Sequence, residues 1–113
     1  MNKDQVKDLF IGMGFVLHTQ PVQYPYVHRA LYALRLTTTP PCKLNGKLFF
    51  HASHHVLNTN GSEWGSIEFD ITAETEDSKW FKLMCYAVPA EDLTEEGVDN
   101  IKARLVRAWG AVQ

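Results

Sequence analysis

Hydrophobic residues near the start of the chain recur with the spacing of an amphipathic helix. They fall at positions i, i+3, i+4 and i+7 and so share one helical face: Val6, Leu9, Phe10 and Met13. Asn2 can cap this helix, with Gln5 three residues later in the capping-box position. Gly14 suits the left-handed conformation that often follows a last turn, and Phe15 can fold back onto the helix. The pattern predicts a helix over residues 3–13.

A second apolar stripe with helical spacing follows Pro89. Its members are Val98, Ile101, Leu105, Ala108 or Trp109, and Val112. Asp92 can cap this helix, and Glu95 stands three residues later in a box-like arrangement. Basic residues lie on the side away from the stripe, toward the C-terminal half, where cations suit the helix dipole: Lys102, Arg104 and Arg107. The pattern predicts a C-terminal helix with one buried face.

Between the helices, apolar and polar residues alternate with a period of two, as in strands. The clearest run is 65–73. Its inward residues are Ile67, Phe69 and Ile71, and its outward residues are Glu68, Asp70 and Thr72. The other predicted strands are 15–20, 26–38, 47–57 and 79–88. A helix is conceivable for 28–36, but the threonine run that follows and the aromatic residues favour a strand.

Turn residues separate these strands. Pro21 and Pro25 make 21–25 a loop or a sheet edge, because proline cannot donate to a strand ladder. Asn60-Gly61 predicts a tight hairpin turn. We therefore expect one α+β domain over 1–113, with an antiparallel sheet of four to five strands and the N- and C-terminal helices packed on one face, in the order α-β-β-β-β-α.

The composition argues against some classes of protein, namely nucleic-acid-binding and membrane-spanning proteins. The chain of 113 residues is 45% hydrophobic, carries 11 Lys and Arg against 13 Asp and Glu, and has a net charge of -2. Nucleic-acid binding is disfavoured, because it depends on a basic excess. No apolar run approaches the ~20 residues that a membrane span needs. Cys42 and Cys85 are far apart in unlike settings, which favours two reduced thiols and a cytoplasmic location.

With both helices on one side, the other side of the sheet carries a mixed set of aromatic, basic and acidic residues. In the assumed register these are Arg29, Leu31, Arg35, Phe49, His51, His55, Glu68, Asp70, Trp80, Lys82, Met84 and Tyr86. A slip of one residue would exchange the two faces. This side is too apolar for an idle solvated surface, so we expect it to bind something.

The histidines of the segment His51-Ala-Ser-His54-His55 invite a metal-site interpretation. On a strand, His51 and His55 point the same way but stand roughly 13 Å apart, at about 3.3 Å per residue. One ion cannot bridge that distance, since zinc lies about 2 Å from each ligand nitrogen. We therefore expect no metal or other cofactor, and His54, on the inward side, is expected to be a hydrogen-bonded core residue.

No nucleophile–base pair can be recognised, so no catalytic residue is assigned and the protein is not expected to be an enzyme. The leading hypothesis is a non-catalytic binding or assembly module that forms a homodimer, or docks another protein, through the open sheet face. The expected binding residues are Trp80, Tyr86, Phe49, Arg35, His51, His55 and Glu68. Trp80→Ala or Tyr86→Ala is expected to weaken association and leave the fold intact.

Two alternatives remain open. In the first, the sheet curls around a small-molecule pocket, with or without enzymatic activity, whose expected lining is Tyr32, His51, His55, Glu68 and Trp80. In the second, the protein binds nucleic acid or acts as an inhibitor through its basic residues, which are Arg29, Arg35, Lys102, Arg104 and Arg107.

Overall fold

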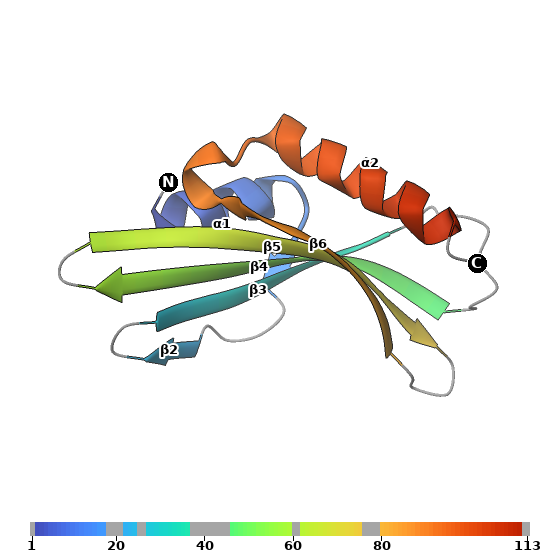
Figure 1. Ribbon diagram of the computed structural model, residues 1–113, viewed down its shortest axis with the longest axis horizontal. Coiled ribbons are helices and arrows are strands. Elements are labelled where there is room, and N and C mark those ends of the chain that lie inside the picture. The colour runs from blue at the N-terminus through green and yellow to red at the C-terminus, as the bar shows by residue number, and fades with distance from the viewer. Residues whose placement is uncertain are drawn as a thin grey trace.

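The computed structural model describes residues 2–17, 22–24, 27–36, 46–59, 62–75 and 80–111. These residues form two α-helices, one short 3-10 helix and an antiparallel sheet (Figure 1). In chain order the elements are α1 (Lys3–Gly12), β1 (Val16–Leu17), β2 (Val22–Tyr24), β3 (Val27–Arg35), β4 (Gly46–Thr59), β5 (Ser62–Thr75), β6 (Trp80–Pro89), η1 (Ala90–Asp92) and α2 (Glu95–Ala111). The expected α+β class, with a helix at each end of the sheet segment, is confirmed.

The sheet is a meander extended by two short strands. Its order is β1-β3-β4-β5-β6, and β2 also pairs with β3. All of these pairings are antiparallel. One row across the sheet joins Leu34, Phe50, Ile71 and Leu83. The segment with two prolines thus contributes a three-residue strand beside β3, in agreement with the expected sheet edge.

The α1 helix begins and ends as its sequence predicts. The Asn2 side chain accepts a hydrogen bond from the Gln5 backbone N–H at 2.8 Å, and the Gln5 side chain accepts one from the Asn2 N–H at 2.9 Å. Gly14 has a φ of 94°, the left-handed conformation that L side chains rarely adopt. Phe15 then turns back, and its ring lies 5.0 Å from that of Phe10 in an edge-on contact.

The start of α2 differs from the predicted one. The helix begins at Glu95, and the Thr94 hydroxyl accepts a hydrogen bond from the Gly97 backbone N–H at 3.0 Å. Asp92 lies in η1 instead of capping α2. The buried stripe contains Val98, Ile101, Leu105 and Trp109, while Ala108 is exposed. Val112 lies outside the described residues.

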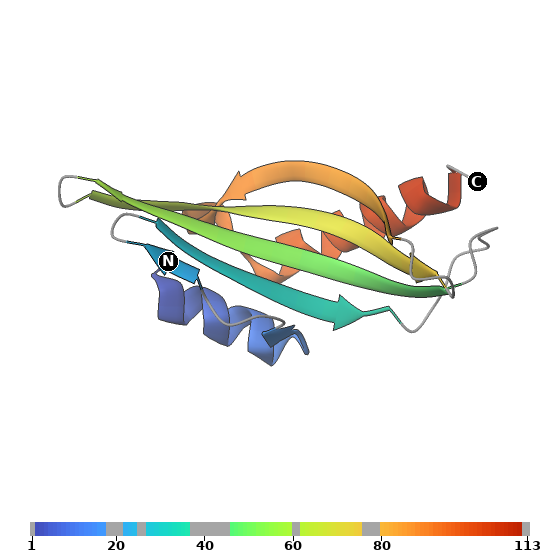
Figure 2. The ribbon, with the colours of Figure 1, turned by 90° about the horizontal axis from the view of Figure 1, so that it is seen from below.

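Both helices pack on one face of the sheet, and their apolar side chains form a single core with it. Figure 2, seen from below Figure 1, shows α2 behind the strands and α1 along the β3 side. From α1, Phe10 contacts Tyr32 and Phe69 with ring centroids 5.0 and 6.3 Å apart. The fully buried side chains include Val6, Phe10, Phe50, Ile67, Phe69, Ile71 and Val98. We call the face turned away from the helices the open face.

A bulge interrupts the pairing of β5 with β6. Glu68 pairs with Ala87, whereas Asp70 pairs with Met84, so Cys85 and Tyr86 share the interval opposite Phe69. An extra residue on one strand bends it, and Figure 2 shows β6 as a strongly curved strand. The unbroken alternation assumed from Trp80 to Tyr86 is therefore wrong at the bulge.

Several sequence expectations fall outside the described part of the chain. These are the Asn60-Gly61 turn, the loop containing Cys42, and the side chains of Trp80, Cys85 and Tyr86. Within the described ranges, neither helix combines the length and hydrophobicity that a membrane crossing requires.

Candidate functional site

The open face brings together five of the seven residues expected to bind a partner. Arg35 pairs with Phe49 across β3 and β4, and His51, His55 and Glu68 follow on the same face of β4 and β5. The side chains of the other two, Trp80 and Tyr86, lie outside the described residues. The binding role of all seven stays a prediction.

A polar network occupies the middle of this face. His51 pairs with Asp70 across β4 and β5, and its Nδ1 lies 3.2 Å from Asp70 Oδ1 and 3.1 Å from Thr72 Oγ1. The Thr72 hydroxyl donates to Asp70 Oδ1 at 2.9 Å. Lys82, from β6, places its Nζ 3.4 Å from Asp70 Oδ2. Three strands thus converge on one carboxylate.

Asp70 and Thr72 were expected to point outward, and they do face away from the helices, yet both are buried. Asp70 is 3% exposed and Thr72 is 6% exposed. An outward position on a strand therefore does not mean exposure here. A buried carboxylate is costly unless hydrogen bonds and charge compensate it, and the open-face network of His51, Thr72 and Lys82 supplies both.

The network lowers the pKa of Asp70, and the ionised carboxylate in turn selects the tautomer of His51. Burial alone raises the pKa of Asp70, but hydrogen bonds from His51 and Thr72, together with the charge of Lys82, lower it below its ordinary value of 3.8. At neutral pH Asp70 is therefore ionised and accepts hydrogen bonds only. His51 must then carry its hydrogen on Nδ1, where it is shared between Asp70 and Thr72. The other ring nitrogen, Nε2, is the acceptor in the neutral imidazole.

Two further contacts extend the polar network along β4. The rings of Phe49 and His51 are stacked, with centroids 6.1 Å apart and an interplanar angle of 6°. At the other end, His55 Nε2 lies 3.5 Å from Glu68 Oε2, on side chains that remain partly exposed. These contacts give the open face an aromatic surface beside a row of charged and polar groups.

The geometry does not form a catalytic triad from these residues. A triad needs a hydroxyl at the histidine nitrogen opposite the one that the carboxylate holds. Thr72 and Asp70 both contact Nδ1 of His51, so Thr72 is not placed for deprotonation by Nε2. Over the described ranges there is no group of three or more His, Cys, Asp or Glu that could hold a metal ion.

His54 lies on the helix side, as expected, and is 2% exposed. Its Nδ1, however, has no hydrogen-bond partner among the described residues, so the expectation of a hydrogen-bonded histidine is not met at this atom. Burial, and then the charges of His28 and His55, lower the pKa of His54 to about 4. His54 is therefore neutral at physiological pH.

The pocket lining expected in the small-molecule alternative is wrong at Tyr32. Tyr32 is 3% exposed and packs against Phe10 on the helix side, whereas His51, His55 and Glu68 lie on the open face. The sheet itself separates them. Tyr32 therefore cannot line a cavity on the open face together with His51, His55 and Glu68.

Sequence reasoning missed the roles of Thr72 and Lys82 in the network. The alternation of residues in β5 and β6 already placed Thr72 and Lys82 on the same face of the sheet. Whether their side chains meet, however, depends on the register across two hairpins. Comparisons with protein-family models, with curated proteins and with solved structures found no match for this chain. The function proposed for it therefore depends on geometry and chemistry alone.

Proposed function

We propose that the protein is a non-catalytic binding module whose open face docks a second copy of the same chain. The observation that carries this proposal is the organised open-face network around Asp70, on the side of the sheet away from both helices. Hydrogen-bonded charged side chains held in one geometry are suited to recognition, because little ordering is needed on association.

The size of the open face fits a stable interface. The molecule is 48 Å long, and its sheet is five strands wide at about 4.8 Å per strand. A typical stable interface needs roughly 800 Å² from each partner, which such a layer exceeds. Partly buried apolar side chains lie between its charged groups, namely Leu31, Phe49 and Leu57. They would supply the apolar part of the interface.

The charged residues of the open face are arranged so that this face can pair with the same face of a second copy of the chain. Arg29 and Arg35 are exposed on β3, Glu68 is on β5, and β4 runs between them. A two-fold axis parallel to β4 would place β3 of one copy over β5 of the other. Arg29 and Glu68 stand two residues apart along the strand direction, a distance that an arginine side chain can span. In such a dimer, Arg29 of each copy pairs with Glu68 of the other copy, so the opposite charges meet twice.

Sedimentation equilibrium on a charge-swap series tests this arrangement. Arg29→Glu and Glu68→Arg are each expected to weaken self-association about tenfold or more, since each places like charges in contact. The double variant Arg29→Glu, Glu68→Arg is expected to restore it. Arg107→Glu, on the exposed side of α2, is the control and should leave association unchanged. A protein that remains monomeric at high micromolar concentration would contradict the proposal.

The cytoplasmic location expected from the sequence belongs to the same proposal. The expected weakening by Trp80→Ala and Tyr86→Ala also stays a prediction of it.

A further inference from the structure

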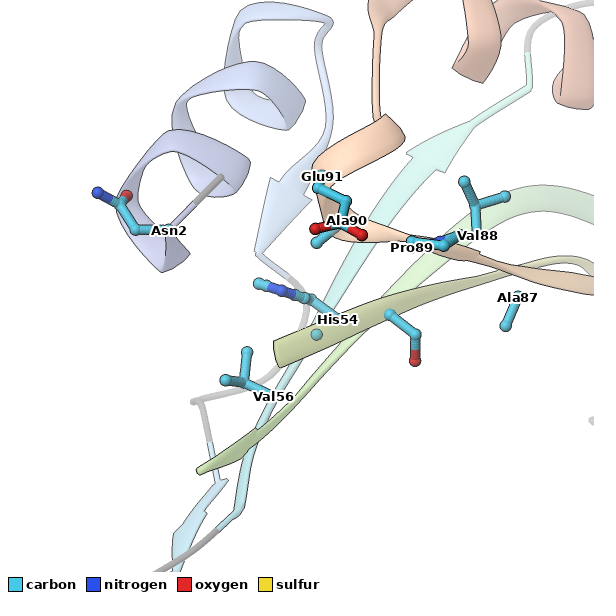
Figure 3. Close-up of a pocket in the computed structure, with 10 residues that line it drawn as sticks. Asn2, His54, Val56, Ala87, Val88, Pro89, Ala90 and Glu91 are labelled. Atoms are coloured by element: carbon cyan, nitrogen blue, oxygen red, sulfur yellow. The ribbon is translucent and has the colours of Figure 1, made fainter. Parts of the chain in front are cut away.

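A cavity of about 670 Å³ lies at the end of β6, between β5, η1 and the residue that caps α1. The last pair of β5 and β6 joins Ser66 to Pro89, so Ser62–Gly65 continue past the end of β6. The described lining residues are Asn2, His54, Val56, Gly65, Ser66, Ala87, Val88, Pro89, Ala90 and Glu91 (Figure 3). They come from the α1 cap, β4, β5, β6 and η1, so five segments surround one volume.

His54 provides the buried polar group of this cavity. Figure 3 shows its ring projecting from β4 toward the side on which Asn2 and Glu91 lie. The residue is 2% exposed, and its Nδ1 has no hydrogen-bond partner among the described residues. A buried polar atom without a partner costs stability, which a ligand that completes the bond would recover.

Gly65 makes room for the histidine ring. A Cβ at position 65 would lie 3.0 Å from His54 Nε2 and 3.0 Å from the backbone oxygen of His55. Any larger residue would therefore force the histidine ring and the His55 carbonyl to shift by a few tenths of an ångström. The residue that shapes this cavity is thus a glycine on the neighbouring strand.

The character of the lining selects the class of ligand. Most described lining residues are apolar and none of them is Lys or Arg, so no cation of the described lining contacts an anion; Lys3, whose charge acts on His54, lies outside that lining. Glu91 is the one acidic residue of the described lining and is exposed, where solvent screens its attraction for a cation. The buried group, His54, is neutral and can accept or donate one hydrogen bond. We infer that this cavity binds a small uncharged ligand, with an apolar body and a hydroxyl or amide group that bonds to His54.

The size of the cavity agrees with this class. Ligand sites in proteins usually measure about 300–1,000 Å³ and combine an apolar lining with a few convergent polar groups. Asn2 and Ser66 add neutral polar groups near the histidine. This site lies apart from the open-face network, so the inference does not depend on the proposed dimer.

Four probes of similar shape test the ligand class: benzyl alcohol, toluene, benzylamine and benzoate. Binding is followed by the backbone amide shifts of Gly65, Ser66, Ala90 and Glu91 in NMR titrations. Benzyl alcohol is expected to give saturable shifts and to bind about fivefold or more tightly than each of the other three, because only it supplies a neutral hydrogen-bonding group. Absence of saturable shifts, equal binding of toluene, or tighter binding of a charged probe would overturn the inference.

Two variants with matched controls assign the binding to this cavity. His54→Leu is expected to bring the affinity for benzyl alcohol down to that for toluene, and Arg107→Gln, on the exposed side of α2, to leave the affinity for benzyl alcohol unchanged. Gly65→Ala should weaken the binding of benzyl alcohol, because the added methyl group displaces the His54 ring. Gly12→Ala adds a methyl group with nothing within 4 Å and should leave the binding unchanged. If His54→Leu does not fold, the site is tested by comparing the binding of benzyl alcohol by Gly65→Ala and by Gly12→Ala. Unchanged binding in Gly65→Ala would then refute the site.

Discussion

His51 and Asp70 face each other across β4 and β5, and their side chains meet at 3.2 Å on the face that carries no helix. Because Asp70 is buried there and ionised, it orients His51 through Nδ1 and holds Lys82 through its second oxygen. One carboxylate therefore determines how two neighbouring strands present their polar groups. The consequences can be measured in both stability and pH dependence.

Replacement of Asp70 by asparagine should destabilise the fold. The amide keeps the size and one acceptor oxygen but loses the charge that holds Lys82 and strengthens the hydrogen bond from His51. We expect the free energy of unfolding to fall by about 1–3 kcal/mol, the range for a buried hydrogen-bonded charge. Urea denaturation measures this change. Asp99→Asn, which removes an exposed ion pair to Lys102 at 3.7 Å, is the control and should change stability by less than about 0.5 kcal/mol.

The pKa of His54 predicts a dependence of stability on pH. Between about pH 4 and pH 6.5 the unfolded chain binds a proton at this histidine that the folded chain does not. The free energy of unfolding should therefore rise with pH across that interval, by up to about 3 kcal/mol from this group. Denaturation at a series of pH values measures the slope. His54→Leu should flatten it, and a slope that is unaltered in this variant would disprove the assignment.

Asp70 also makes the free energy of unfolding rise with pH, but at lower pH than His54 does. Its pKa is below 3.8 in the folded protein, so its contribution to stability is present above the unfolded value and is lost as the pH falls through the folded one. Asp70→Asn should therefore reduce the pH dependence of the free energy of unfolding below about pH 4 and leave the His54 interval intact. NMR titration of the Asp70 carboxyl checks the direction of its shift.

The sequence predicted much of the fold because local signals agreed with one another. The capping box at Asn2, the glycine at 14 and the alternation of Ile67, Phe69 and Ile71 each depend on neighbours in the chain. The predicted cap of α2, Asp92, was wrong, because Thr94 belongs to a residue type that can also cap and accepts the hydrogen bond from the Gly97 N–H. Leu93 is buried at 5% exposure, and Thr94 is the residue that follows it into the helix.

The candidate sites were harder to predict because their partners come from different strands. Glu68, Asp70 and Thr72 were placed on the correct face, but the burial of Asp70 depends on His51 and Lys82 across two strand pairings. The bulge opposite Phe69 shifts one of those pairings by a residue. No periodicity in a single strand contains that information.

The cap of α2 can be tested directly. Thr94→Ala removes the hydroxyl that accepts from the Gly97 N–H, and should lower the free energy of unfolding by about 1 kcal/mol. Asp92→Ala, in the preceding turn, should cost less than half as much. Urea denaturation of both variants gives the comparison. An equal or larger loss in Asp92→Ala would show that the aspartate stabilises the helix start.

Substitution by alanine is expected to change the stability in opposite directions at two glycines near the end of α1. Gly14 has a φ of 94°, where an alanine is strained, so Gly14→Ala should destabilise the protein by about 1–2 kcal/mol. Gly12 is helical with open space where a methyl group would be added, so Gly12→Ala should stabilise it by about 0.5–1 kcal/mol through helix propensity. Thermal denaturation should therefore shift the two variants to opposite sides of the wild type. A gain in stability for Gly14→Ala would mean that the turn after α1 does not need its left-handed residue, and that the contact of Phe15 with Phe10 is set by packing alone.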